Sequence, residues 1–443
     1  MLERVFHLNH NGTNVRRELI AGLTTFAAMA YILALNPAIL VSGGATGMEL
    51  KGLITVTALA AAAGCFLMAA MTNYPIAQAP GMGINSYFAS IIVVHMGIPW
   101  EGALAMVFWN GVLFFALSIT GLRTRIVHAL PRPIHIGIQS GIGFFIAFIG
   151  LKNSGLVVGS PITLVAEGDL LSPGPLVALA GLALIVVLTR FRVAGSIILV
   201  VLLLTVAGLF IPTGESTLTA QPTGLFSMPA GIGQTFLALD WLYPFRHFEA
   251  ALPVIFTLLL LDLFDSIGTL VGLARQSGLM DKDGHMPKLG RALSADAAAT
   301  VIGALLGTST TTAYLESATG MQAGGRTGLT AVVTGLCFLV ALFFTPVISI
   351  IPTAATAPAL IFVGLLMARC LSDLDHDNML ETAPAVFTAL LIPLCYSITG
   401  GIALGLLLYC AAMILSGRGR KLSWLTYALA GVFILFFVLG QKA

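Results

Sequence analysis

Charged side chains are scarce in this chain of 443 residues, because Asp, Glu, Lys and Arg together make up only 9% of it. A soluble domain carries about 25%. Hydrophobic residues reach 58%, and apolar runs of the ~20 residues that a membrane-spanning helix needs recur from end to end. The alternating ~10-residue pattern of a transmembrane β-barrel does not dominate. The composition therefore predicts an all-α, multi-pass protein embedded in a lipid bilayer.

Several functional signatures are also missing. The five cysteines show neither CxxC nor Cys/His ligand spacing, so we predict no metal site and no cofactor. The chain has no Walker, GxSxG or HExxH motif, which gives no support to ATP-driven transport or to a hydrolytic enzyme. The net charge of +2 is too weak to indicate nucleic-acid binding. A membrane-embedded enzyme would need a metal cluster or a nucleophile–base pair, and neither is visible, so we expect a transporter and not an enzyme.

The apolar runs and the breaks between them define the expected segments. A polar stretch containing Pro and Gly, 212–247, separates two halves of the chain and is interpreted as a linker. A last apolar run, 424–440, is either an additional span or a helix at the membrane surface. The remaining predicted segments are 18–40, 51–72, a broken element at 75–95, 101–121, 134–151, 174–190, 194–211, 248–274, 293–307, a second broken element at 308–323, 327–346, 356–370, 383–397 and 400–416.

Basic residues orient these segments, because cytoplasmic loops of membrane proteins are enriched in Lys and Arg. Most basic residues fall on one side if the N-terminus is inside, which predicts a cytoplasmic N-terminus in the cytoplasmic (inner) membrane. The residues on that side are Arg16, Arg17, Arg123, Arg125, Arg132, Arg190, Arg192, Arg275, Lys282, Lys288, Arg291, Arg369, Arg418, Arg420 and Lys421.

The two halves resemble each other. Residues 57–88 and 294–321 each contain a small-residue helix followed by a short polar segment that Gly or Pro interrupts. Residues 130–151 likewise resemble 351–371. With about seven segments per half, such a repeat must have inverted topology. Interrupted hydrophobic segments at matching places in two halves point to a transporter substrate site.

The two interrupted segments differ in how the helix is broken. In YPIAQAPGMGINSYF, the residues Pro75, Pro80 and Gly81 prevent a continuous helix. In GTSTTTAYLESATG, the run of Ser and Thr favours extended structure. Glu316 then lies near the start of the following half-helix, where free N–H groups stabilise a carboxylate. Broken backbone at membrane depth is tolerated only inside protein or beside a cavity, although ordinary kinks are the alternative interpretation.

Two further acids lie in the apolar sequence LLLLDLFDSIGTLVG. Asp262 and Asp265 are three residues apart and share a helix face, on which Thr269 follows. An ionised side chain at this depth costs on the order of 2.5–3.5 kcal/mol, and two ionised acids in a dry site would repel each other. These acids either bind substrate and a proton or belong to a structural hydrogen-bond network. We expect Asp265 or Glu316 to carry the proton.

Weaker candidates surround the broken segments. Gln78, Asn85 and Gln139 can hydrogen-bond a ligand or another helix, and for Asn110 the second role is preferred. Aromatic residues such as Tyr31, Phe88 and Tyr314 can stack on a planar ring or pack in the core. The complete candidate substrate-binding set is Asp262, Asp265, Glu316, Thr269, Gln78, Asn85, Thr312, Tyr314, Leu315, Ser317, Phe88 and Thr25.

The motifs AGLTTFAAMAYILALNPAIL, APGMGINSYF, LDLFDSIGTLVGLA, GTSTTTAYLESATG and GGRTGLTAVVTGL resemble the hypoxanthine–adenine–guanine (AzgA-like) permease branch of the nucleobase:cation symporter family. The resemblance implies about fourteen segments in two inverted repeats. It also implies a core domain from 1–121 and 248–346 and a gate domain from 130–211 and 351–443. By position, Asp265 and Glu316 match the acids that hold the base, and FDSIG favours Asp265 over Asp262.

The expected function is therefore import of purine bases (adenine, guanine or hypoxanthine) by proton symport, with elevator-like movement of core against gate. A proton is favoured over Na⁺, since no separate cluster of carbonyl and hydroxyl ligands is visible. The sequence does not fix the oligomeric state, and a homodimer is one arrangement that we consider. The alternative function is an anion transporter or channel of the sulfate-permease type, which should lack a carboxylate at the tenth-segment half-helix.

Overall fold

The computed structural model describes residues 2–42, 45–120, 131–161, 163–213, 216–221, 224–277, 279–280 and 286–440. Three of the basic residues used to orient the chain, Arg123, Arg125 and Lys282, lie outside these ranges. The described residues are mostly helical, with three two-stranded antiparallel sheets that the all-α expectation did not include.

The first half of the chain contains helices close to the predicted segments. The segment predicted as 18–40 is two helices, α2 and α3, that meet at Ala30 and Tyr31. The elements are α1 (Leu2–Phe6), α2 (Val15–Met29), α3 (Ile32–Val41), α4 (Leu50–Thr72), β1 (Gln78–Pro80), α5 (Met82–Ser86), a π-helical segment (Tyr87–His95), α6 (Trp100–Thr120), α8 (Arg132–Asn153), β2 (Val157–Ser160), β3 (Leu164–Glu167), α9 (Pro173–Arg190), α10 (Ser196–Gly208), β4 (Pro212–Thr213) and β5 (Ser216–Thr217).

The second half follows the same plan and includes a C-terminal helix at the last apolar run. Its elements are α11 (Tyr243–Arg246), α12 (Phe248–Ser277), α13 (Leu289–Leu306), β6 (Thr311–Ala313), α14 (Ser317–Gln322), α15 (Gly328–Ala341), a 3₁₀ turn (Leu342–Phe344), α16 (Thr345–Ser349), α17 (Thr353–Ala368), a 3₁₀ turn (Arg369–Asp373), α18 (Met379–Leu394), α19 (Ile398–Leu415), a 3₁₀ turn (Gly419–Lys421) and α20 (Trp424–Gly440).

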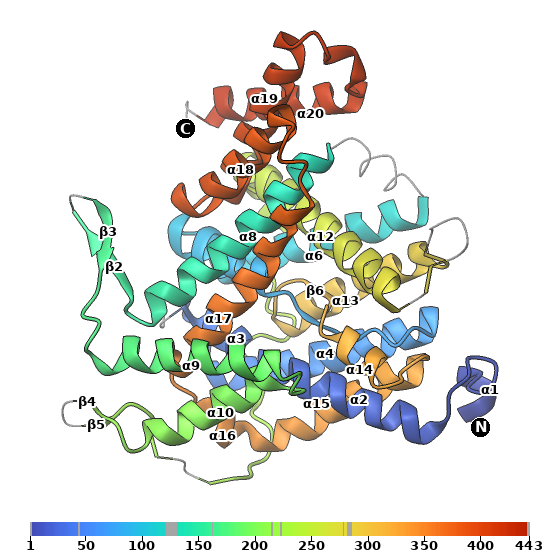
Figure 1. The fold of residues 1–443 in the computed structure, drawn as a ribbon, viewed down its shortest axis with the longest axis vertical. Helices are drawn as coiled ribbons and strands as arrows, with labels where there is room; N and C mark the ends of the chain where they lie inside the picture. The colour runs from blue at the N-terminus through green and yellow to red at the C-terminus, as the bar shows by residue number, and fades with distance from the viewer. Residues whose placement is uncertain are drawn as a thin grey trace.

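Within the described ranges, nine helical segments are long and apolar enough to cross a membrane. Shorter apolar helices accompany them at Met82–His95, Ser196–Gly208, Met379–Leu394 and Gly400–Leu415. In Figure 1, α18 to α20 lie at one end of the molecule and the β2–β3 hairpin projects from its side. These features establish a multi-pass membrane protein.

The two broken segments meet in the interior. Strands β1 and β6 pair antiparallel, with Gln78 opposite Ala313 and Pro80 opposite Thr311, and all six strand residues are buried. Each strand therefore satisfies backbone groups of the other where no water is present. The helix behind β6 has no room for a side chain where it contacts the strand: a Cβ on Gly303 of α13 would lie 2.7 Å from the Thr311 Oγ1 atom.

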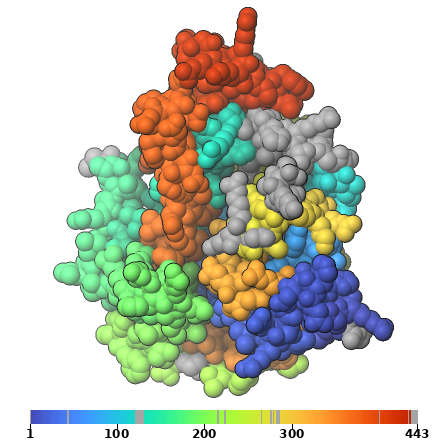
Figure 2. Space-filling view, turned by 45° about the vertical axis from the view of Figure 1, so that its right-hand side comes forward, coloured from blue at the N-terminus to red at the C-terminus, as the bar shows by residue number. Residues whose placement is uncertain are grey.

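Contacts between helices repeat when the two halves are exchanged. Helix α4 packs on α15 as α13 packs on α6, and α2 packs on α15 as α12 packs on α6. Similarly, α8 packs on α18 as α17 packs on α9. Equivalent contacts of this kind are what a twofold internal repeat produces. In Figure 2 the N-terminal segment lies beside the segment that contains α14 on the face in view, which agrees with the packing of α2 on α14.

The described part of the predicted linker, 212–213, 216–221 and 224–247, contacts the ends of several helices. Its backbone N–H groups at Ser227, Leu237 and Asp240 donate to the carbonyl oxygens of Phe343 (3.0 Å), Leu305 (2.8 Å) and Glu101 (3.2 Å), respectively. These hydrogen bonds attach the linker to the ends of α15, α13 and α6. The described part of this linker therefore also contacts helices of both halves.

Helices α8 and α17 approach so closely at Gly143 and Gly364 that neither position has room for a side chain. A Cβ on Gly364 would lie 2.3 Å from the Gly143 carbonyl oxygen. We expect Gly364→Ala to lower the free energy of unfolding by about 1–3 kcal/mol, because the two backbones must separate. The measurement is thermal unfolding of the purified protein in detergent.

Gly431→Ala is the matched control for this substitution. Gly431 also lies in a helix, α20, but a Cβ there would have no atom within 4 Å. It should leave the unfolding midpoint unchanged or raise it slightly, since alanine favours helix over glycine. Equal destabilisation by both variants would contradict the close packing of α8 on α17.

Candidate functional site

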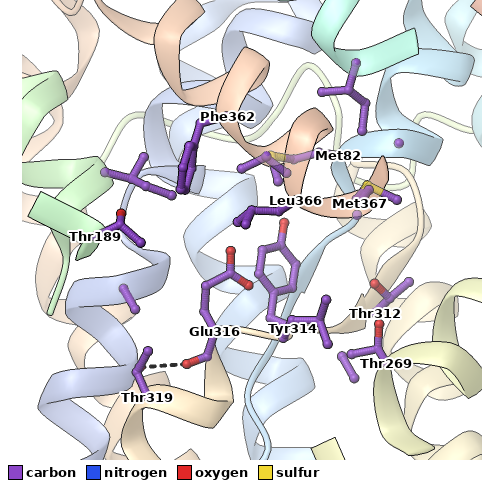
Figure 3. A pocket seen from close by; sticks show the side chains of 18 of the residues that line it. Met82, Thr189, Thr269, Thr312, Tyr314, Glu316, Thr319, Phe362, Leu366 and Met367 are labelled. Atoms are coloured by element: carbon purple, nitrogen blue, oxygen red, sulfur yellow. Dashed lines mark hydrogen bonds between the residues drawn. The ribbon is translucent and has the colours of Figure 1, made fainter. Parts of the chain in front are cut away.

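A cavity of about 640 Å³ lies between the broken segments and the helices α8 and α17. This volume falls within the roughly 300–1,000 Å³ typical of small-molecule sites. One wall comes from the ends of β1 and β6 with α12 and α14, and the other from α8, α17 and the loop between α9 and α10. Figure 3 shows side chains from these elements converging on the cavity.

Six of the twelve residues in the candidate substrate-binding set line this cavity, and so does the weaker candidate Gln139. The six lie on α12, on strand β6 and between β6 and α14, and they are Asp265, Thr269, Thr312, Tyr314, Leu315 and Glu316. On the opposite wall, the lining includes Gln139, Ile142, Phe362, Leu366 and Met367. The cavity is thus polar along one wall and apolar or aromatic along much of the other.

Glu316 immediately precedes α14 and occupies its N-cap position. Its side chain does not cap the helix; instead, its carboxylate Oε1 accepts a hydrogen bond from the Tyr31 hydroxyl. The Thr319 hydroxyl donates to the Glu316 backbone oxygen at 2.7 Å and so fixes the start of α14. Figure 3 shows the carboxyl group beside the Tyr314 ring, with Leu366 and Phe362 beyond it.

Asp265 reaches the same cavity from α12. The Thr312 hydroxyl donates to its Oδ2 atom at 3.3 Å, which joins α12 to strand β6. Thr269, one turn further along α12, also lines the cavity. The two carboxylates that face the cavity therefore come from different elements, and each accepts a hydrogen bond from a hydroxyl group.

Tyr314 brings an aromatic ring to the same cavity as these acids. Its hydroxyl donates to the Pro80 backbone oxygen at 2.5 Å, and its backbone N–H donates to the Ala77 oxygen at 3.1 Å. Both contacts fix the ring against the first broken segment. An aromatic ring held at both ends offers a rigid surface on which a planar ligand can stack.

Asp262 lies away from the cavity, although it is on the same helix as Asp265. It is fully buried, and its Oδ2 atom accepts from the Asn110 side-chain amide at 2.6 Å on α6. Residues three apart on a helix differ in direction by about 60°. Here that difference directs Asp262 to the neighbouring helix and Asp265 to the cavity, so the shared face predicted from spacing divides into two environments.

The other predicted residues lie behind the cavity wall. Gln78 donates to Asp296, Asn85 contacts Asn36 and Ser309, and the Ser317 hydroxyl accepts from the Ala77 backbone N–H at 3.0 Å. Phe88 is buried in the apolar core, and Thr25 on α2 packs where Gly320 of α14 comes close. These side chains hold the broken segments in place, and the structure does not bring them to the cavity surface.

Two buried acids have structural roles that sequence reasoning missed. Asp296 on α13 accepts from the Gln78 amide (2.8 Å), the Ala313 backbone N–H (2.9 Å) and the Ser266 hydroxyl. Glu18 on α2 accepts from three backbone N–H groups and one hydroxyl at the start of α15. For Asp296, the available signal in the sequence was an acid within a helix of small residues. The partners of Glu18 are visible only in the fold.

Asp296 and Asp265 should differ in their effect on stability. Asp296→Ala removes the acceptor for Gln78, Ala313 and Ser266 in a fully buried place. Each buried donor left without a partner costs about 1–3 kcal/mol. We expect a lower unfolding midpoint in detergent for Asp296→Ala, with Asp265→Ala close to wild type because its side chain faces a cavity. The opposite order would contradict these two environments.

Apolar helices, two interrupted segments that pair in the interior and a carboxylate-lined cavity together define a multi-pass membrane transport protein. The chain belongs to the Permease family, which matches residues 16–404.

The relatives extend over the whole length. Adenine permease AdeQ of Escherichia coli (strain K12) is 41% identical over 438 residues, covering 99% of this chain and 96% of the relative. Guanine/hypoxanthine permease PbuG of Bacillus subtilis (strain 168) is 41% identical over 446 residues, covering 99% of each chain. These matches confirm the resemblance predicted from the motifs, and relatives named as permeases point to a protein that is not an enzyme.

A solved structure shares the fold. The transmembrane domain of a cyanobacterium bicarbonate transporter, BicA, superposes with a TM-score of 0.63 and 18% identity, covering 90% of this chain and 97% of that one. At this identity the likeness shows the fold alone. It confirms the helical architecture, and the expectation of about fourteen segments with a core and a gate stays a prediction.

Proposed function

We propose that this protein is a secondary active transporter that imports purine bases by proton symport across the cytoplasmic membrane, with its N-terminus in the cytoplasm. The observation that carries the proposal is the pair of carboxylates, Asp265 and Glu316, that face one cavity beside the paired broken segments. The relatives named as adenine and guanine/hypoxanthine permeases support the same substrate class.

The chemistry of the cavity suits an uncharged, planar, hydrogen-bonding ring. Purines have N–H donors that a carboxylate can accept and ring nitrogens that a protonated carboxyl can donate to. The Thr312 hydroxyl and the Gln139 amide offer further donors and acceptors along the walls. Tyr314 and Phe362 supply aromatic surface on which the ring can stack.

The anion-transport alternative has the fold of BicA in its favour. The site chemistry opposes it, because two carboxylates would repel an anion in a confined cavity. Arg192 lines the cavity from the α9–α10 loop, but its side chain is exposed and solvent screens its charge. A neutral base therefore fits the lining better than bicarbonate or sulfate does.

Proton coupling follows from the same acids. Membrane potential alone cannot concentrate a neutral base, so a cation must enter with it. Asp265 or Glu316 would take up a proton from outside together with the base and release both inside, since binding of the two ligands is linked reciprocally. The Tyr31 and Thr312 hydroxyls each donate a hydrogen bond to one of these carboxylates.

For alternating access, we propose that a core domain (1–121 and 248–346) and a gate domain (130–211 and 351–443) move relative to each other. Both would contribute walls to the cavity. At one edge, the α9–α10 loop touches α2 directly: Gly195 has a φ angle of +72°, and a Cβ there would lie 2.8 Å from the Ala27 carbonyl oxygen. This side-chain-free contact would have to separate when the cavity changes sides.

Substitution of the acids tests the site. Glu316→Gln should reduce uptake by at least ~10-fold, equivalent to about 1.4 kcal/mol, because it keeps the shape and removes the titrating group. Asp265→Asn should weaken purine binding similarly. Asp262→Asn is the matched control, since Asp262 contacts Asn110 and not the cavity. Binding of radiolabelled adenine, guanine and hypoxanthine to the purified variants is the measurement, and a loss confined to Asp262→Asn would show that the wrong acid was assigned.

Uptake into proteoliposomes tests substrate and coupling together. Purine uptake should rise with an inward proton gradient, collapse with a protonophore and stay constant when K⁺ replaces Na⁺ at fixed pH. Uptake driven by Na⁺ and indifferent to the protonophore would refute proton symport while leaving the purine site intact. Uptake of bicarbonate or sulfate, with no uptake of any purine, would instead favour the anion transporter.

A further inference from the structure

Tyr31 occupies an unusual place behind the cavity. It lies at the junction between α2, which ends at Met29, and α3, which begins at Ile32. Its side chain is fully buried in the apolar core. From there its hydroxyl reaches Glu316, which lies 285 positions away in the sequence. The α2–α3 junction thus brings the Tyr31 hydroxyl to the Glu316 carboxylate within otherwise apolar surroundings.

The Tyr31 hydroxyl gives the Glu316 carboxyl a fixed donor in the described part of the chain. The charged or titratable groups that share the cavity are Asp265 on α12, Tyr314 after β6 and Arg192 in the α9–α10 loop. Tyr314 donates its own hydroxyl to Pro80, and Asp265 would repel an ionised Glu316. The Tyr31 hydroxyl is therefore a side-chain contact that stabilises the ionised form of Glu316.

A phenol distinguishes the two states of a carboxyl group. Donation to an ionised carboxylate is charge-assisted and about twice as strong as donation to a neutral group. A protonated carboxyl that donates its own proton would require Tyr31 to accept it, and the Tyr31 hydrogen would then need another acceptor inside apolar surroundings. The contact consequently opposes protonation of Glu316.

We propose that Tyr31 is a positioning residue that sets the pH range over which Glu316 accepts the co-transported proton. This inference rests on the proposed function, because it assigns Tyr31 a role in proton-coupled binding of a purine base. The hydrogen bond also anchors the side chain of Glu316 to the α2–α3 junction. The carboxyl group is therefore in place at the cavity before a base binds.

The test is binding of radiolabelled adenine, guanine and hypoxanthine to the full chain in lipid nanodiscs between pH 5 and pH 9. Tyr31→Phe removes the donor and keeps the ring. If proton and base bind together, the alkaline limit of binding should move to higher pH by about one unit, which corresponds to loss of one charge-assisted hydrogen bond. Fluorinated tyrosine at position 31, a stronger donor, should move the limit to lower pH without altering the fold.

Two comparisons isolate the role of Tyr31. Tyr74→Phe is the matched control, because the Tyr74 hydroxyl donates to the Pro287 backbone oxygen away from the cavity; it should leave the pH profile unchanged. In a Glu316→Gln background, which already lacks the titrating group, Tyr31→Phe should not change the pH profile of the binding that remains. The inference would be overturned if Tyr31→Phe shifted the pH profile even in the Glu316→Gln background. It would also be overturned if Tyr31→Phe lowered the affinity equally at every pH and fluorinated tyrosine had no effect.

The outcomes also separate this inference from the proposed function. If the wild-type protein binds none of the three purines at any pH, the proposed function fails. If it binds a purine with a clear pH limit that neither Tyr31→Phe nor fluorinated tyrosine moves, the function stands and the role of Tyr31 is wrong.

Discussion

The pairing of β1 with β6 is the constraint on which the rest of the structure depends. Two short extended segments in an apolar interior expose backbone groups that must be satisfied within the protein, and here each strand satisfies the other. The pairing forces glycine onto the helices behind the strands and places the ends of both broken segments at one cavity. Tyr314, Glu316 and Thr312 face the cavity because the register of this small sheet is fixed.

Around this sheet, buried carboxylates divide between structural and cavity environments. Asp296 and Glu18 have their oxygen atoms occupied by backbone N–H groups and polar side chains, which makes them internal caps. Asp265 and Glu316 each have one hydroxyl partner and an open cavity. The number of protein donors around each acid thus separates the groups that hold the backbone from those with capacity left for a ligand.

Much of this arrangement could be predicted from sequence. Hydropathy placed the helices within a few residues, and the proline and glycine breaks located both interrupted segments. The importance of Asp265 and Glu316 followed from acids in apolar sequence. What could not be predicted was which way each polar side chain turns: Asp262 and Asp265 differ by one small rotation on α12, and Gln78 or Asn85 serve other protein groups only because segments far apart in sequence meet there. The roles of Tyr31 and Asp296 depend on such long-range contacts and were not predicted.

The interlocking of the two halves has a consequence for biosynthesis. Strand β1 has no pairing partner until Ala313 has been made, and Gln78 waits for Asp296, which lies 218 positions later. A nascent chain that contains only the first half would therefore hold an extended segment with unsatisfied backbone groups inside lipid. The centre of this protein can therefore take its final form only after Ala313 has been made, whatever the order in which the outer helices enter the membrane.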